Sequence, residues 1–252
     1  MKILTSLILL LSFPAVSAQK NQKGEISYYV FNANGEPCKI EEGKFIGILE
    51  KLADTAWQWK YYNFTGPIIS VETYSDKEMT TPAGYFAFFD NNGKIDSSGF
   101  VAEGKKDKIW YYFDDSLKII QKEKFNQGGL LERKGREELY SSHKTDLTDS
   151  IKRDEREAYF KGGETQWRKY LEKNMKIPER TTKLSKNGTA VFSFVIATDG
   201  SVRNVKIIQS VEYSFDEAFA KILSQCPKWV PAFHNGKAVN AYRRQPMTIR
   251  SN

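Results

Sequence analysis

Residues 189–208 read TAVFSFVIATDGSVRNVKII, and this stretch decides the fold of the C-terminal third. Its first half has apolar side chains at every second position (Ala190, Phe192, Phe194 and Ile196). A period of two is typical of a half-buried β-strand. Asp199-Gly200 predicts a tight turn, after which residues 202–208 return as the partner strand. The stretch therefore predicts an antiparallel hairpin with one face in a core.

Helices are predicted on both sides of this hairpin. The first begins near residue 165, has one apolar face and is ended by Pro178. The second follows Ser214, which with Glu217 predicts a capping box, and its apolar stripe continues to Cys226. Strands at residues 229–233 and 238–249 follow, separated by an Asn-Gly turn. The order of elements predicts an α+β domain with two helices on one face of an antiparallel sheet.

Several motifs of this region occur together in a known family. They are Gly162-Gly163-Glu164, residues 189–195, Asp199-Gly200-Ser201-Val202, Phe215-Asp216-Glu217-Ala218, residues 228–232 and Asn235-Gly236-Lys237. In this order they resemble the C-terminal domain of TonB-like energy transducers, over residues 162–250. The resemblance implies a docking function, in which a short peptide of an outer-membrane TonB-dependent receptor joins a sheet edge as a β-strand.

The strand at residues 239–249 matches the docking edge of that family. The resemblance implies that the partner-binding residues lie there, namely Val239, Ala241, Tyr242, Arg243, Arg244, Gln245 and Met247. The two arginines would attract an acidic peptide, or they are solvated surface residues. Pro246 has no N–H to donate and is expected at an edge or a bulge. An open strand of this kind also allows a homodimer through the C-terminal strand.

The N-terminus has the features of a secretory signal. Lys2 precedes an apolar run at residues 3–13, and Ala15-Val16-Ser17-Ala18 has the small residues of a signal-peptidase site. We predict a signal peptide at residues 1–18, cleaved after Ala18, and a periplasmic mature protein. An uncleaved segment would instead tether the chain to the membrane. The net charge of +7 comes from bases interspersed with acids, which argues against nucleic acid as a partner.

Residues 19–131 are predicted to form a separate all-β domain of hairpin repeats. Four aromatic segments recur there, namely Tyr28-Tyr29-Val30-Phe31-Asn32, Trp59-Lys60-Tyr61-Tyr62-Asn63, Phe86-Ala87-Phe88-Phe89-Asp90 and Trp110-Tyr111-Tyr112-Phe113-Asp114. The second and fourth match at a constant offset of 51, which also aligns Glu72 with Glu123. Single hairpins are unstable in water, so they must share a sheet or stack. The pattern resembles degenerate MORN repeats of the bacterial antitoxin-like variety, and its aromatic residues form either a core or a binding surface.

Residues 132–161 have the composition of a charged linker, with an exposed helix predicted at residues 148–159. No cofactor, metal or enzyme is predicted, because His143 and His234 are the only histidines and neither lies near a nucleophile motif. Cys38 and Cys226 fall in different domains and are expected to stay unpaired, although export permits a disulfide.

The expected function is therefore partner binding, with a possible link to TonB-dependent transport. The transducers that the chain resembles keep a membrane helix and a Pro-rich spacer. Here the helix is predicted to be cleaved, and no proline occurs between Ala83 and Ile177. Transduction of proton-motive energy is therefore in doubt. The alternative is an envelope adaptor, in which the aromatic repeats bind a cell-envelope component.

Overall fold

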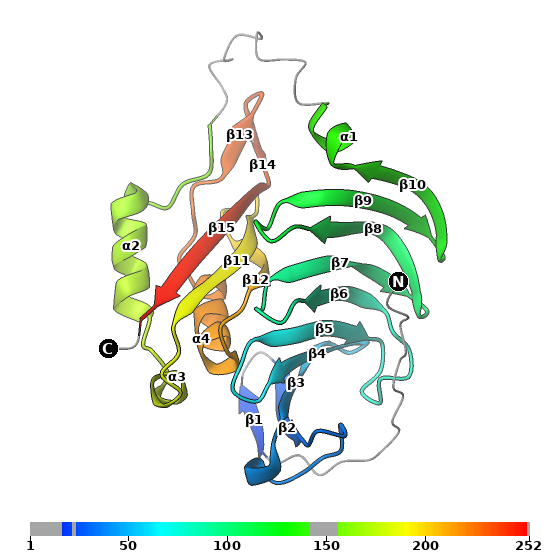
Figure 1. Ribbon diagram of the computed structural model, residues 1–252. Coiled ribbons are helices and arrows are strands. Elements are labelled where there is room, and N and C mark those ends of the chain that lie inside the picture. The colour runs from blue at the N-terminus through cyan, green and yellow to red at the C-terminus, as the bar shows by residue number, and fades with distance from the viewer. Residues whose placement is uncertain (1–16, 22–23, 142–155, 251–252) are drawn as a thin grey trace. The chain divides into compact units, whose positions relative to one another are not determined.

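The computed structural model describes residues 17–21, 24–141 and 156–250. They form two compact units, and the chain passes from the first to the second after Ser141 (Figure 1). The first unit is dominated by strands and the second mixes helices and strands, as the sequence predicts. Cys38 and Cys226 are both free thiols.

The first unit is built around one antiparallel sheet. Its ten strands are hydrogen-bonded in chain order, so that each inner strand pairs with the one before it and the one after it. The strands are β1 (Ser17–Asn21), β2 (Gly24–Phe31), β3 (Phe45–Ala53), β4 (Ala56–Asn63), β5 (Ile68–Tyr74), β6 (Gly84–Phe89), β7 (Ile95–Ala102), β8 (Lys105–Phe113), β9 (Ile119–Asn126) and β10 (Gly129–Gly135). A 3-10 turn η1 (Ile40–Glu42) and a short helix α1 (Arg136–Ser141) complete the unit. The predicted hairpins therefore share one sheet.

The aromatic segments of the repeat lie on the alternate strands β2, β4, β6 and β8. The offset of 51 residues is preserved in the strand register, where Trp59 lies opposite Glu72 and Trp110 lies opposite Glu123. Both indoles are buried, with exposed fractions of 3% and 2%. At these positions the aromatic pattern therefore builds the core of the sheet.

Each of these two indoles packs on a glycine of the strand before it. A Cβ atom at Gly47 of β3 would lie 2.7 Å from the Trp59 ring, and one at Gly99 of β7 would lie 2.4 Å from the Trp110 ring. No side chain fits at either position unless the indole moves. The two copies of the repeat thus share a glycine–tryptophan contact between neighbouring strands.

The charged connector differs from its prediction. Residues 148–155 of the predicted helix lie outside the described residues. Its last four residues, 156–159, are not helical. Arg156 and Tyr159 instead form β-bridges with Phe233 and Val230. Extended chain forms here because Ala158 and Phe160, two residues apart, are both buried. The predicted linker also begins too early, since β10 continues to residue 135 and α1 follows it. The predicted signal peptide falls almost wholly outside the described residues, and its last two residues, 17 and 18, begin β1.

The second unit is an α+β domain. Its elements are α2 (Gly163–Asn174), α3 (Glu179–Lys183), β11 (Gly188–Ile196), β12 (Val202–Gln209), α4 (Tyr213–Ser224), β13 (Ala232–His234), β14 (Lys237–Val239) and β15 (Ala241–Ile249). Three strands form the main sheet in the order β12-β11-β15, and β13 pairs with β14 in a separate hairpin. The quoted hairpin at residues 189–208 is thus β11 and β12, as predicted.

The core of this unit lies between the main sheet and the helices. The four alternating apolar residues of β11 are each 0–2% exposed. Phe192 meets Phe219 of α4 edge to face, with ring centroids 5.1 Å apart. The Tyr170 hydroxyl of α2 donates to the Ile222 carbonyl of α4 over 3.0 Å, and Trp167 of α2 donates to Gln245 on the same face of the sheet. Both long helices therefore lie on one face, as predicted.

Two predicted helix boundaries are wrong. Helix α2 ends at Asn174, where Met175 turns extended, and Pro178 instead precedes a short helix, α3, in what the sequence presents as a polar loop. The capping box of Ser214 and Glu217 does not form, because α4 begins one residue before Ser214. Its N-cap is Glu212, which stays in extended conformation and accepts from the N–H groups of the first turn.

Candidate partner-binding site

The strand β15 lies at an edge of the main sheet in the C-terminal unit (Figure 1). It pairs with β11 without a bulge from Ala241 opposite Ile196 to Ile249 opposite Gly188. Within residues 156–250, no strand pairs with its other side. Pro246 lies inside this strand, opposite Val191, so the prediction that it occupies an edge position is confirmed.

Successive side chains of β15 point to opposite faces of the sheet. Arg243, Gln245 and Met247 lie opposite core residues of β11 and are half-buried on the helix side. Tyr242 and Arg244 lie on the other face and are exposed, and Tyr242 has an exposed fraction of 83%. Five of the seven predicted site residues thus divide between two faces of one strand, and Ala241 begins that strand.

The seventh predicted residue, Val239, lies outside the edge strand. It belongs to β14, where it is paired with Ala232 of β13. The predicted continuous strand at residues 238–249 is broken at Asn240, because the hairpin of β13 and β14 forms a sheet of its own. The edge therefore begins at Ala241, two residues later than predicted.

The two arginines of the edge have different surroundings. The Arg243 guanidinium donates to Glu157 Oε2 over 3.1 Å and to the carbonyl oxygen of Ala158. It therefore joins β15 to the extended segment that enters the unit. Arg244 points to the opposite face and is exposed.

A hollow of about 340 Å³ lies beside β15, between that strand and α2. Met175, Ile177, Leu171 and Met247 supply apolar walls, and Arg168 and Glu172 supply charges. Beside the hollow, Trp167 Nε1 of α2 donates to Gln245 Oε1 over 2.7 Å and so fixes the helix against the strand. The sequence predicts the helix and the strand separately, and the hollow depends on how they pack.

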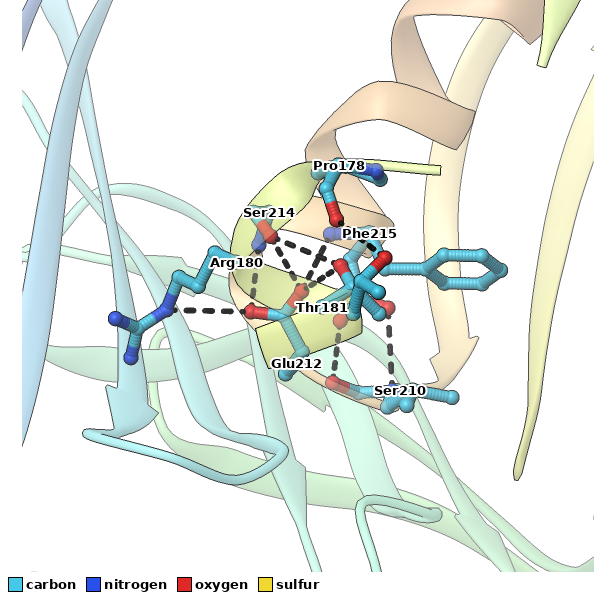
Figure 2. A network of polar contacts seen from close by, with 10 residues as sticks. Pro178, Arg180, Thr181, Ser210, Glu212, Ser214 and Phe215 are labelled. Carbon is cyan, nitrogen blue, oxygen red and sulfur yellow. Dashed lines mark hydrogen bonds and ion pairs between the residues drawn. The ribbon is translucent and has the colours of Figure 1, made fainter. Parts of the chain in front are cut away.

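A buried polar network holds α3 to the start of α4 (Figure 2). The Thr181 hydroxyl donates to Glu212 Oε1 over 2.5 Å, and the Ser214 hydroxyl donates to the same oxygen. Arg180 Nε lies 3.6 Å from Glu212 Oε2, and the backbone N–H of Phe215 donates to Glu212 Oε1 over 2.9 Å. A carboxylate that is 1% exposed thereby has partners for both oxygens. The network fixes the chain that follows Met175 and Ile177, two walls of the hollow.

A second buried carboxylate lies in the first turn of α4. Asp216 is 0% exposed and accepts from the Ser210 hydroxyl and, over 3.1 Å, from the N–H of Val211. Burial raises the pKa of Asp216 to about 8, and the two hydrogen bonds offset only part of that rise. The negative charges of Glu217 and Glu212 add to the increase. Asp216 is therefore mostly protonated at neutral pH.

Residues 173–248 match the family described as Gram-negative bacterial TonB protein C-terminal. The match runs from the end of α2 to Thr248 in β15, so it includes the edge strand, and it confirms the resemblance drawn from the motifs. Neither the curated proteins nor the solved structures contain a match.

The rest of the chain lies outside that match. The ten-stranded sheet precedes residue 173, and its likeness to MORN repeats stays a prediction. Within the parts of the chain that the structure describes, no helix combines the length and the apolar character needed to cross a bilayer.

Proposed function

We propose that the C-terminal unit binds an extended segment of an outer-membrane TonB-dependent receptor as a fourth strand beside β15. The observation that carries the proposal is that β15 pairs with β11 on one side, while no strand among residues 156–250 pairs with its other side. A strand edge presents unpaired N–H and C=O groups, and an extended peptide satisfies them. The match to a TonB C-terminal family over this same region supports the choice of partner.

The register indicates which backbone groups face the partner. Alternate residues of an antiparallel strand turn both of their polar groups to the same side. Pro246 has no N–H and cannot donate to β11, so it occupies a position at which no hydrogen bond to β11 is needed. The hydroxyls of Thr248 and Thr189 lie 2.8 Å apart, which fits the close spacing of a pair that exchanges no backbone hydrogen bond. Tyr242, Arg244 and Thr248 lie an even number of residues from Pro246. Their N–H groups therefore point to the open edge.

The side chains of the edge favour an acidic segment. Arg244 is exposed on one face of the strand, and Arg168 is exposed at the hollow on the other. Arg244 would meet a carboxylate of an added strand. At the hollow, Arg168 and Glu172 supply one charge of each sign, and the apolar walls would receive an intervening side chain. The proposed ligand is thus an extended peptide with acidic and apolar residues. This is the binding step of TonB-dependent transport, and the proposal includes no transduction of energy.

Export by the predicted signal peptide would place this interaction in the periplasm. The predicted cleavage after Ala18 would leave residues 19–21 to form what remains of β1. Mass determination of the purified mature chain tests this directly. We expect the mass of a chain that begins at Gln19. The mass of a chain that still includes Met1 would indicate that the apolar segment is retained and tethers the protein to the membrane.

Site-specific photocrosslinking tests the strand addition. A photoreactive phenylalanine at position 242 of the full-length chain replaces a side chain that is 83% exposed, and it should crosslink to a TonB-dependent receptor in cell envelopes. Arg244→Pro removes one outward N–H and should abolish the crosslink. Arg244→Ala keeps that N–H, removes the charge and should retain most of the crosslink.

Undiminished crosslinking by the Arg244→Pro variant would contradict strand addition. A crosslinked product with twice the mass of the chain would instead assign the edge to a homodimer. The Arg244→Pro variant must also keep its fold, which circular dichroism checks.

A further inference from the structure

The two matching copies of the aromatic repeat hold the same cluster of side chains, and one copy shows what the cluster binds. In the copy formed by β8 and β9, the ammonium group of Lys106 lies 4.5 Å from the ring centroid of Trp110, 5.2 Å from that of Tyr112 and 5.3 Å from that of Phe125. It also donates to the Tyr112 hydroxyl over 2.7 Å. Three rings around one ammonium group make a cation–π cage.

A buried carboxylate completes this cage. Glu123 is 3% exposed and accepts from the Tyr112 hydroxyl over 2.6 Å. Arg133 and Gln121 donate to its other oxygen over 2.6 and 2.9 Å. Burial opposes the charge of Glu123, but these hydrogen bonds and the nearby cations hold its pKa below the usual value. In this copy, the charge of the buried carboxylate is therefore balanced by two cations of the same sheet, Lys106 and Arg133.

The other copy, formed by β4 and β5, repeats the cage. The register pairs Trp59 with Glu72 as it pairs Trp110 with Glu123, and Tyr61 and Tyr74 take the places of Tyr112 and Phe125. Glu72 accepts from the Ser70 hydroxyl over 2.9 Å, as Glu123 accepts from the aligned Gln121. It also accepts from the Tyr74 hydroxyl over 2.6 Å, whereas the tyrosine that donates to Glu123 is Tyr112, the counterpart of Tyr61. The rings and the carboxylate are thus present in both copies. With Met79 in place, Trp59 and Tyr61 stack on one another with ring centroids 5.3 Å apart, whereas Trp110 and Tyr112 both lie against the Lys106 ammonium.

The cations of the cage are present in one copy alone. The residue aligned with Lys106 at the offset of 51 is Thr55, in the turn between β3 and β4. No cation of the described residues forms an ion pair with Glu72. The ammonium groups of Lys51 and Lys77 lie over the Trp57 ring, and each pairs with another carboxylate.

Met79 contacts the tyrosine of this copy that corresponds to Tyr112. Its sulfur lies 3.8 Å from the Tyr61 hydroxyl, where the other copy has an ammonium 2.7 Å from a tyrosine hydroxyl. Its side chain is half-buried and packs against the core cluster that contains Trp59. Met79 comes from the loop between β5 and β6, and its φ of +60° is a left-handed conformation that few non-glycine residues adopt. A thioether side chain is flexible and can repack at low cost.

We propose that the cluster of Trp59, Tyr61, Tyr74 and Glu72 is a binding site for a primary alkylammonium group, with Met79 as its displaceable plug. The rings supply cation–π attraction, Glu72 supplies the counter-charge, and the Tyr61 hydroxyl accepts a hydrogen bond from the ammonium. This site lies in the N-terminal sheet, and it is independent of the strand addition proposed for the C-terminal unit.

The test uses n-butylammonium, which has the length of a lysine side chain, as the probe of the full-length chain. Binding is followed by the NMR signal of the Trp59 indole N–H. We expect Met79→Ala to bind n-butylammonium about tenfold more tightly than the unaltered chain, because the plug is gone. Adding Glu72→Gln to Met79→Ala should weaken that binding about tenfold, because the counter-charge is lost.

The matched control lies in the other copy. Lys106→Ala empties that cage, and n-butylammonium should then shift the Trp110 indole signal instead. n-Butanol has the same shape without the charge and should bind Met79→Ala at least tenfold more weakly than n-butylammonium does. Equal binding of the alcohol and the amine would overturn the proposal, because it would show a plain apolar hole. So would binding that Glu72→Gln leaves unchanged.

The tripeptide Gly-Lys-Gly separates two sources of the ammonium group. Binding as tight as that of n-butylammonium supports a site for a lysine of another protein. Exclusion of the tripeptide, with n-butylammonium still bound, supports a site for a free amine.

Discussion

Replacing Gly99 by alanine should destabilise the N-terminal sheet, because the new methyl group has no room beneath Trp110. The added Cβ would lie 2.4 Å from Cγ and Cδ2 of the indole. Carbon atoms in contact are normally about 3.5–4.0 Å apart, so the ring must move by about 1 Å. Trp110 is 2% exposed, and its Nε1 donates to the Phe100 carbonyl over 2.8 Å, which opposes that movement.

The magnitude follows from two opposing effects. Overpacking a core by a methyl group costs about 1–3 kcal/mol. Replacing glycine by alanine where the backbone allows it returns about 0.4–1 kcal/mol, because the unfolded chain loses freedom. The expected net loss is about 1–2 kcal/mol in the free energy of unfolding. With a urea slope of about 1–3 kcal/mol/M, this lowers the unfolding midpoint by about 0.3–2 M.

The chain offers a matched control for this prediction. Gly135 lies in β10, and a Cβ there would have no atom within 4 Å. Gly135→Ala should therefore leave the midpoint unchanged or raise it slightly. Urea titrations of the full-length variants, followed by the indole N–H signals of Trp59 and Trp110, report on this sheet alone. A midpoint for Gly99→Ala equal to that of Gly135→Ala would refute the close packing of Gly99 on the indole.

Two further predictions concern the polar network of the C-terminal unit. Thr181→Val leaves the buried Glu212 one donor short and should lower the free energy of unfolding by about 1–3 kcal/mol in urea titrations, a loss that Thr181→Ser should largely avoid. Asp216 has a folded pKa raised to about 8, so its protonated form stabilises the fold below the unfolded pKa of 3.8, and this contribution falls as the pH rises to about 8. Asp216→Asn keeps a neutral group there, so the difference in unfolding free energy between Asp216→Asn and the unaltered chain should grow in favour of asparagine from pH 4 to pH 8. A difference independent of pH would show that Asp216 is ionised throughout.

Local patterns of the sequence predict much of the C-terminal fold. The alternation at Phe192 and Phe194 and the turn at Asp199-Gly200 predict β11 and β12, because a strand with one buried face has an unmistakable period. The helix boundaries are wrong where a tertiary partner decides them. Glu212 replaces Ser214 as the cap of α4 because Thr181 and Arg180, which are distant in sequence, neutralise and satisfy its buried carboxylate.

The candidate site is predicted less completely than the fold. The prediction that residues 238–249 are largely extended is correct. Periodicity alone does not show that Asn240 divides them between two sheets. The hollow beside β15 depends on the packing of α2, which no local pattern contains. In the N-terminal sheet the offset of 51 residues identifies the paired carboxylates Glu72 and Glu123. It does not reveal that Met79, from outside the matching strands, contacts Tyr61 in one of the two copies.

Hydrogen exchange at the backbone of β15 tests the central claim most directly. In the monomeric full-length chain, the account predicts rapid exchange at the amides of Tyr242, Arg244 and Thr248, and slow exchange at the intervening Arg243 and Gln245, which bond to β11. An added receptor peptide should slow the first three. If these three amides are as protected as their neighbours before any partner is added, the edge is already paired and the proposed recognition is contradicted.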